Sequence, residues 1–329
     1  MTSPNPPWLG PIVAQLTSLA DRNRMPHALL LHESRGCGGE WLALQTAMLL
    51  LCRKREAGNA PCGTCPDCRR VVHREHPDLL WTEPDADKQQ LRVDQIRELG
   101  AELALTTHGG GARVAVVTPA ESMNAAAANA LLKSLEEPPP GTVIILVTAD
   151  ASRLPATIRS RCQRIRLPRP DRSTALQWLA QAHGASEDWS AALDLAGGGP
   201  FAAACIPADQ ARAIRQDVID ALQHLQRGEH PGNAAVHWAQ ADTALYLVAL
   251  ENWLTDRIFS AAGDRPQFSG QGEPAHLQDG VPARNIVELL AVQRELARIR
   301  SQLATPINRK MAIEALLWHL AMALQRRTA

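Results

Sequence analysis

Four cysteines lie close together in the sequence, at positions whose spacing could bind a metal ion. They follow a C-x9-C-x2-C-x2-C pattern around the turn-rich segment PCGTCPDC. Closely spaced thiolates in turns suit a tetrahedral zinc centre that is closed and therefore structural. The alternative is four reduced cysteines without metal, but so polar a loop buries little apolar surface and needs a metal to hold it together. The predicted zinc ligands are Cys52, Cys62, Cys65 and Cys68.

A glycine-rich segment follows the apolar run His27–Leu31, in the order strand, loop and helix that is typical of a phosphate-binding loop. When the pattern G-x-x-x-x-G-K-[ST] is aligned on Gly38, Glu33 replaces the first glycine, Gly39 the lysine and Glu40 the hydroxyl residue. These changes remove a cation that pairs with phosphate and a ligand of Mg²⁺, and they add an anion. Two interpretations remain open, a glycine turn that only packs a helix against a strand and a degenerate loop with weak nucleotide binding. The second would use Gly36, Gly38 and Gly39.

Two arginines end a short predicted helix in the segment Arg159-Ser160-Arg161-Cys162. The guanidinium group is always charged and grips phosphate through two hydrogen bonds, so either arginine could bind a phosphate. From spacing alone, a solvated helix face is the favoured explanation of both arginines.

An amphipathic helix and a buried strand must position these arginines. Ala128, Leu131, Leu132 and Leu135 share one helical face, and three prolines stop this helix at Glu137. The next segment, Thr142–Thr148, is β-branched and almost wholly apolar, which is typical of a parallel strand covered on both faces.

Further strands and helices alternate along the first half of the chain, which predicts an α/β fold with a parallel sheet. Residues 164–170 alternate in polarity and end in prolines, which indicates an edge strand followed by a linker. The other expected helices are Trp8–Ala20, Trp41–Leu51 and Val93–Leu105, and the other expected strands are Leu79–Trp81 and Val114–Val117.

The second half of the chain reads as helical. Ser173–Ala182 and Trp189–Ala196 form a small unit, and from Ala208 onward the helices are interrupted by a polar loop at Ala261–Ala283. The last helix, Asn308–Gln325, has an apolar stripe that either belongs to the domain core or is shared with another chain. We therefore predict three domains: 1–167 with the cysteine module at 52–68, 168–207, and 208–329.

Composition restricts the classes of function. Lysine and arginine together number 34 of the 329 residues, as do aspartate and glutamate, so no global basic field attracts nucleic acid. The sequence shows neither a signal-peptide pattern nor an apolar run of roughly 18 residues, so we expect a cytoplasmic protein without membrane contact. In that reducing compartment, clustered cysteines indicate metal before disulfides.

Several motifs together resemble the clamp-loader branch of the AAA+ ATPases: NALLKSLEEPP, the strand ending in Thr148, Ser160-Arg161-Cys162, the cysteine module and the final INRKMAIEALLWHL. The resemblance implies an AAA+ domain with an inserted zinc module, a small helical lid and an all-helical collar that holds a ring of subunits together. It also implies that Arg161 is an arginine finger, which reaches the γ-phosphate of ATP bound by a neighbouring subunit. Arg159 is a lesser candidate for that role.

The chain departs from active relatives at three places. Besides the altered loop, Thr118 and Pro119 stand where an Asp-Glu pair would organise Mg²⁺ and water, and Pro200 stands where an arginine would touch nucleotide. The resemblance therefore implies a stator without catalysis of its own, with structural Zn²⁺ and with ATP held by its neighbours. Its implied partners are γ/τ-type motor subunits, a δ-type subunit and, through the complex, the sliding clamp and primed DNA.

Two other classes of function stay open. An ATP-hydrolysing motor subunit would require the lysine, hydroxyl and acidic residues that this sequence lacks. A zinc-dependent DNA-binding module would require basic or aromatic residues around the cysteines. Basic residues are present there, namely Arg53, Lys54, Arg55, Arg69 and Arg70.

Overall fold

The computed structural model describes residues 4–85, 88, 90–107, 111–185, 187–261, 286–303 and 307–325. The chain divides into two compact units, Met1–Thr174 and Ala175–Ala329. The finer division at 167 and 207 stays a prediction. Except for Ala261, the predicted polar loop at 261–283 lies outside the described residues.

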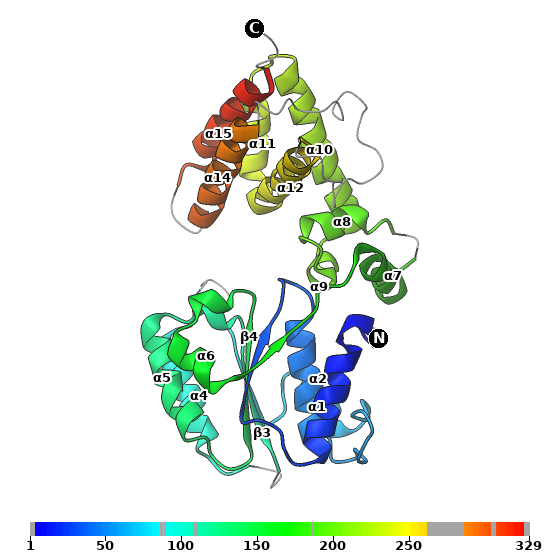
Figure 1. Cartoon of the computed structure of the whole chain (residues 1–329), viewed down its shortest axis with the longest axis vertical. Helices are drawn as coiled ribbons and strands as arrows, with labels where there is room; N and C mark the ends of the chain where they lie inside the picture. Colours follow the sequence, from blue (N-terminus) through cyan, green and yellow to red (C-terminus); the bar gives the residue numbers. More distant parts are fainter. Residues whose placement is uncertain are drawn as a thin grey trace. The chain divides into compact units, whose positions relative to one another are not determined.

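The first unit is built on five parallel strands in the order β2-β3-β4-β1-β5, which confirms the predicted α/β fold (Figure 1). β4 is buried along its whole length, and β5 lies at an edge of the sheet with three of its four residues exposed, as expected for these segments. The strands are β1 (Ala28–His32), β2 (Leu79–Thr82), β3 (Arg113–Val117), β4 (Thr142–Thr148) and β5 (Gln163–Arg166).

Helices cover both faces of the sheet: α4, α5 and α6 lie on one side, and α1 and α2 lie on the other (Figure 1). α3 follows the cysteine segment. The helices of this unit are α1 (Gly10–Asp21), α2 (Gly39–Leu51), α3 (Pro66–Val72), α4 (Val93–Leu103), α5 (Ala125–Glu136) and α6 (Ala156–Arg161), with short 3-10 helices at Pro7–Leu9, Ala120–Ser122 and Ala151–Arg153.

The alternation of side chains along the strands explains this layering. Leu30 of β1 and Leu146 of β4 are paired in the sheet and pack in one apolar cluster with Leu131 of α5 and Ile158 of α6. The Asn124 side chain caps α5 by accepting a hydrogen bond from the Ala127 N–H at 2.8 Å. α5 ends before the prolines, as the sequence predicts, so a side-chain cap and the prolines set the two ends of this helix.

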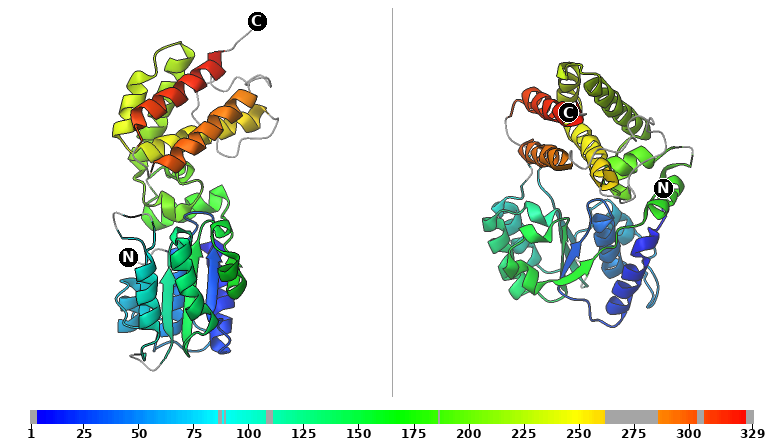
Figure 2. Two further views of the ribbon diagram at one scale, coloured as in Figure 1. Left: turned by 90° about the vertical axis from the view of Figure 1, so that its left-hand side faces the viewer. Right: turned by 45° about the horizontal axis from the view of Figure 1, so that its top comes forward.

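The described part of the second unit is entirely helical (Figure 2). Among the described residues, no helix combines the length and the hydrophobicity needed to span a bilayer. α7 (Arg172–His183) crosses the boundary between the units, and the others are α8 (Ser190–Leu195), α9 (Pro200–Ala203), α10 (Ala208–Gln226), α11 (Gly232–Gln240), α12 (Thr243–Ala261), α14 (Ile286–Gln302) and α15 (Arg309–Gln325).

The apolar stripe of α15 is divided between core and surface. Ile313, Leu316, Leu317 and Leu320 are fully buried, whereas Met311 is 65% exposed. Most of the predicted stripe therefore belongs to the core of the unit, and the exposed end of the helix is available for another contact.

Candidate functional site

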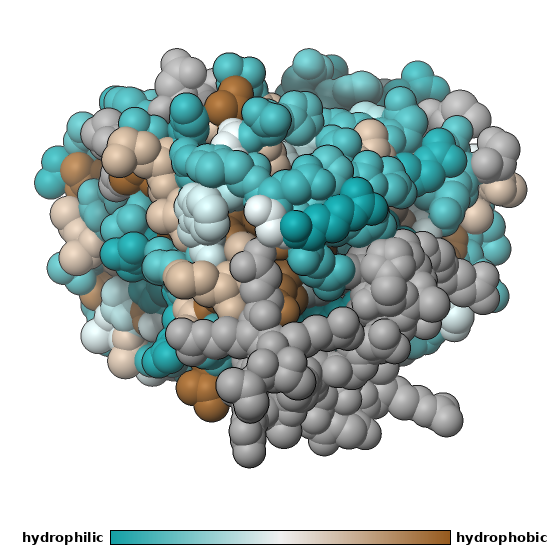
Figure 3. Space-filling model, turned by 90° about the horizontal axis from the view of Figure 1, so that it is seen from above, coloured by the Kyte–Doolittle hydropathy of each residue, from teal (hydrophilic) through white to brown (hydrophobic). Residues whose placement is uncertain are grey.

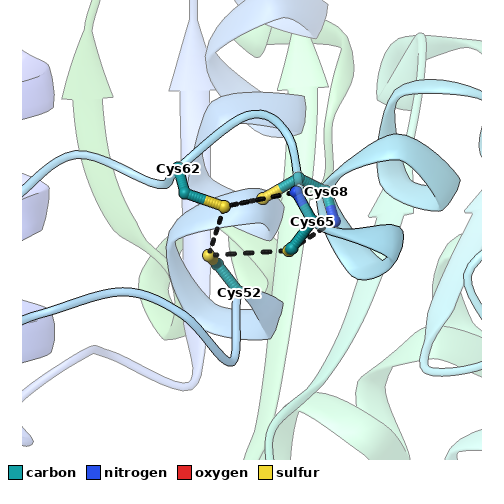
Figure 4. Close-up of side chains that lie close together, drawn as sticks. All are labelled: Cys52, Cys62, Cys65 and Cys68. Atoms are coloured by element: carbon teal, nitrogen blue, oxygen red, sulfur yellow. Dashed lines mark hydrogen bonds between the residues drawn. The ribbon is translucent and has the colours of Figure 1, made fainter.

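The structure brings the four predicted metal ligands together at the ends of two helices. Cys52 caps the C-terminus of α2, Cys65 caps the N-terminus of α3, and Cys68 lies in the first turn of α3. Cys62 comes from the loop between these helices, and all four sulfur atoms turn toward one another (Figure 4). Three of the cysteines are buried and Cys62 is half-buried, and four thiolates would fill every position of a tetrahedral ion, as in a structural centre.

The distances between the sulfur atoms fit a tetrahedral zinc ion. Cys52 and Cys62 are 3.6 Å apart, whereas Cys65 lies 3.9 Å from Cys52 and Cys68 lies 3.9 Å from Cys62. All four sulfurs lie within 4.8 Å of one another. Zn–S bonds of about 2.3 Å in a tetrahedron place sulfurs about 3.8 Å apart, whereas a disulfide would hold two of them at about 2.0 Å. The donor set therefore fits zinc without rearrangement of the chain.

The backbone around the cysteines favours thiolates at part of the cluster. The N–H groups of Thr64 and Cys65 lower the pKa of the Cys62 thiol to about 6. Burial raises the pKa of Cys68, so this thiol stays protonated in the absence of a metal. A bound Zn²⁺ takes all its cysteine ligands as thiolates, so its positive charge would stabilise Cys68 in the thiolate form.

Acidic side chains fasten the cysteine module to the rest of the unit. Asp21 at the end of α1 accepts hydrogen bonds from Arg55 at 2.6 Å and from the Gly58 N–H at 2.9 Å. Hydrogen bonding by Arg55 lowers the pKa of the Asp21 carboxyl. His76 accepts a hydrogen bond from the Asp78 N–H in the turn before β2.

Ion pairs occupy some of the basic residues expected of a DNA-binding module. Arg55 binds Asp21, and Arg53 lies 3.5 Å from Asp67. Lys54, Arg69 and Arg70 are exposed. Two of the five positive charges are thus partly neutralised within the chain, and three are exposed at the surface.

The glycine-rich loop between β1 and α2 has the backbone shape that the sequence predicts. Gly36 has φ = 75° and Gly38 has φ = 108°, which side chains rarely allow, and Gly38 caps the N-terminus of α2. The Trp8 indole N–H donates to the Cys37 carbonyl at 2.8 Å and holds the loop from outside. The loop is therefore built like a phosphate cradle, with backbone N–H groups at a helix N-terminus.

The side chain of Glu33 lies inside this loop, which its position in the sequence did not reveal. Its Oε2 accepts a hydrogen bond from the Gly39 N–H at 2.8 Å, and the N–H groups of Cys37 and Gly38 also face the carboxylate. Burial outweighs these three N–H groups and raises the pKa of Glu33, and the negative charge of Glu40 acts in the same direction.

A network of charged side chains lies beside the loop. The Thr118 hydroxyl donates to Glu40 Oε1 at 3.1 Å, and Arg74 Nη2 lies 3.1 Å from Glu40 Oε2. Arg74 also pairs with Glu83 at 2.7 Å and stacks over the Trp81 ring, with its guanidinium carbon 4.0 Å from the ring centroid. Sequence reasoning missed Arg74, because its partner Glu40 lies 34 residues away along the chain.

Arg161 lies at the C-terminal end of α6, with its side chain 36% exposed. Its Nη2 is 2.5 Å from Glu136 Oε1 at the end of α5, and its Nη1 donates to the Thr157 carbonyl at 3.1 Å. Arg159 is half-buried, and its Nε has no hydrogen-bond partner among the described residues.

The structure separates Arg161 from the chain's own glycine-rich loop. α6 and α2 cover opposite faces of the sheet (Figure 1). Arg161 precedes β5, which begins beside Leu29 of β1, whereas the loop starts at the other end of β1, after His32. The four residues of β1 from Leu29 to His32 span about 13 Å, so Arg161 and the glycine-rich loop do not form one site.

Comparison with known proteins identifies relatives along almost the whole chain. The family model described as DNA polymerase III, delta subunit, matches residues 9–171. DNA polymerase III subunit delta′ of Pseudomonas aeruginosa is 33% identical and aligns with 94% of this chain and 95% of its own length. The corresponding protein of Escherichia coli is also 33% identical, over 97% of this chain and 96% of its own length. A gamma subunit-related protein of Thermotoga maritima, a solved structure, covers 94% of this chain and 98% of its own at 16% identity, with a TM-score of 0.48.

Proposed function

We propose that this chain, which belongs to the family of DNA polymerase III delta′ subunits, is the non-hydrolysing stator of a bacterial clamp loader. It would assemble in the cytoplasm with γ/τ motor subunits and with δ. The complex would load the sliding clamp on primed DNA during replication. Arg161 would supply positive charge to ATP held by the adjacent motor subunit. The zinc ion at Cys52, Cys62, Cys65 and Cys68 would be structural.

The observation that carries this proposal is the position of Arg161 relative to the chain's own loop. Because the arginine lies at the opposite end of β1 and on the opposite face of the sheet, a phosphate that it contacts must belong to another chain. An arginine finger supplied in trans requires that separation.

The contacts of Arg161 are weak enough to be exchanged for a phosphate. Its partner Glu136 is 49% exposed, and exposed ion pairs contribute about 0.2–1 kcal/mol. A phosphate offers Arg161 a second, bidentate set of hydrogen bonds with more negative charge. Glu136 therefore holds the guanidinium in place without preventing its transfer to a neighbour's ATP.

The chain's own loop supports the non-hydrolysing part of the proposal. Gly39 supplies no cation to a phosphate, and Glu40 would meet a triphosphate with negative charge. Thr118 uses its hydroxyl to bind Glu40, and Pro119 has no group that could activate water.

The second unit offers apolar side chains for subunit contact. Met311, Trp318 and Met322 recur along one side of α15 and are 65%, 41% and 51% exposed. On α14, Val287 and Leu290 are also exposed. In the described part of the surface in Figure 3, hydrophobic side chains gather in small groups among hydrophilic ones. A contact with other subunits would combine these apolar groups with a polar rim.

The test is the DNA- and clamp-stimulated ATPase rate of a complex reconstituted with γ/τ and δ subunits, with wild type compared with Arg161→Ala. An arginine finger contributes about 10³ to 10⁵ in rate in GTPases, so we expect a sharp fall. Arg153→Ala is a matched control, because it removes an exposed arginine from the neighbouring 3-10 helix.

Size-exclusion chromatography must show that each complex assembles, and the isolated chain must be inactive. An intact Arg161→Ala complex with the wild-type rate would refute the finger. ATP hydrolysis by the isolated chain would indicate a motor subunit instead, and tight binding of DNA by the isolated chain at moderate salt would indicate a DNA-binding module.

A further inference from the structure

The loop between β1 and α2 holds a negatively charged group that comes from the chain itself. Glu33 follows β1, where its backbone N–H donates to the Thr148 carbonyl at 3.0 Å, and its side chain turns back into the loop. Its carboxylate binds the Gly39 N–H at 2.8 Å and faces two more N–H groups. Backbone N–H groups at a helix N-terminus are the ones that bind phosphate oxygens in nucleotide-binding loops.

Gly39 shows that the loop is fitted to this carboxylate. A Cβ atom at Gly39 would lie 2.8 Å from Glu33 Oε1 and 2.6 Å from Val147 Cγ1, and both distances are too short for real contacts. No lysine therefore fits at position 39 while the Glu33 side chain and Val147 keep their places. Where the phosphate-binding pattern has glycine and lysine, this chain has Glu33 and Gly39. The two differences belong together, because the missing side chain at Gly39 leaves the space that the Glu33 side chain fills.

The surroundings of the loop add to its resistance to anions. Glu40 begins α2 beside Glu33, and its carboxylate already binds Thr118 and Arg74. An incoming polyphosphate would have to displace one carboxylate and approach a second. Glu33 is the stronger barrier because it fills the loop, whereas Arg74 partly neutralises the exposed Glu40.

We infer that Glu33 is a built-in anion, which takes the place of a phosphate in the loop and keeps nucleotide polyphosphates out. On this inference the loop keeps the backbone shape that binds phosphate, and it excludes nucleotide because the Glu33 carboxylate already fills it. This inference goes beyond the stator proposal, because it concerns the chain's own loop and does not depend on Arg161 or on any partner.

The experiment uses the full isolated chain and sodium tripolyphosphate as the probe, with sodium chloride at equal ionic strength as the blank. Glu33→Gly empties the cradle. Glu33→Gln keeps an oxygen beside the Gly39 N–H but removes the charge, and Glu40→Gln removes a nearby charge without emptying the cradle. Binding is measured by isothermal titration calorimetry and by the shift in melting temperature.

We expect no binding by wild type or by the two glutamine variants. Glu33→Gly should bind at least tenfold more tightly than wild type, and its melting temperature should rise by about 5 °C or more when tripolyphosphate is about 100 times its Kd. If circular dichroism shows that Glu33→Gly does not fold, Glu33→Ser serves instead, because its side chain is too short to reach Gly39.

Three outcomes would overturn the inference. They are binding by wild type as tight as by the emptied variant, an equal gain in either glutamine variant, and a folded emptied variant that gains no binding. Because no partner is present and Arg161 is unchanged, these outcomes are independent of the ATPase test of the stator.

Discussion

Replacing Cys65 with serine tests the zinc centre while it leaves the local helix cap in place. Cys65 is 3% exposed, and its sulfur accepts a hydrogen bond from the Cys68 N–H at 3.4 Å at the start of α3. A serine hydroxyl can accept the same hydrogen bond, and serine is a preferred N-cap residue. Serine does not replace a thiolate as a zinc ligand, so Cys65→Ser removes the metal bond selectively.

The structure indicates how much of the module's stability depends on the metal. Val71 is a fully buried apolar side chain beside the cluster, and burying such a side chain contributes about 1.5–3 kcal/mol. The ion pair between Arg55 and Asp21, whose side chains are 15% and 21% exposed, ties the cysteine loop to α1. Structural zinc contributes about 10–16 kcal/mol in zinc-finger peptides, so a zinc ion at the cluster would outweigh these two contacts, and we expect its loss to unfold the module locally.

The assay combines metal analysis with limited trypsin digestion. After dialysis against dilute EDTA, wild type should retain about one zinc ion per chain, and Cys65→Ser should retain almost none. Trypsin should then cut the variant faster at Arg53, Lys54, Arg69 or Arg70, while circular dichroism reports an intact sheet domain.

Cys205→Ser is the control, since Cys205 is an exposed cysteine outside the cluster. The reasoning fails if Cys65→Ser keeps wild-type zinc. It also fails if wild type binds no zinc and its module resists trypsin equally well.

Three more predictions follow from particular side chains. The pKa of Glu33 in the folded chain lies above its ordinary value of 4.5. Protonation of Glu33 therefore stabilises the fold fully below pH 4.5, and this stabilisation is lost as the pH rises through the folded-state pKa. Urea unfolding should therefore show Glu33→Gln gaining stability over wild type from pH 4.5 upward, and a constant difference would contradict the burial argument. Glu136→Gln removes the charged partner of Arg161, so the assembled complex should keep its ATPase rate or raise it by up to about fivefold. A fall in rate like that of Arg161→Ala would show instead that Glu136 positions the arginine. Leu131→Ala removes a side chain that is 1% exposed and should lower the free energy of unfolding by about 2–5 kcal/mol in urea, whereas a loss below about 1 kcal/mol would argue against this core.

The fold of the first unit was predictable because its strands and helices carry strong local patterns. Thr142–Thr148 is almost wholly apolar because helices cover both faces of its strand, and the prolines after Glu137 end α5 wherever that helix packs. The division of the second unit was less accessible. Helical periodicity identifies the stripe of α15, but it does not tell a buried Leu317 from an exposed Met311.

The cysteine cluster was predictable for a different reason, namely that four ligands within a short segment restrict one another's positions. The contacts of Arg161 and Arg74 were not, because each depends on a carboxylate from another element. Arg161 lies 25 residues from Glu136, and Arg74 lies 34 residues from Glu40. Sequence spacing predicts contacts within a helix or turn, whereas these pairs form only after the sheet has brought the elements together.

The altered phosphate loop shows why substitutions in a motif need to be considered as a set. Taken one at a time, Glu33, Gly39 and Glu40 each remove a feature of nucleotide binding, and each would leave an unsatisfied cradle or an uncompensated charge. In the structure Glu33 satisfies the N–H groups of the cradle, Gly39 leaves room for it, and Arg74 with Thr118 neutralises and binds Glu40. Restoring the lysine alone would create a steric clash with Glu33 and Val147. Glu33→Gly combined with Gly39→Lys is therefore the smallest change that could return a phosphate-binding lysine to this loop, provided that Val147 can shift.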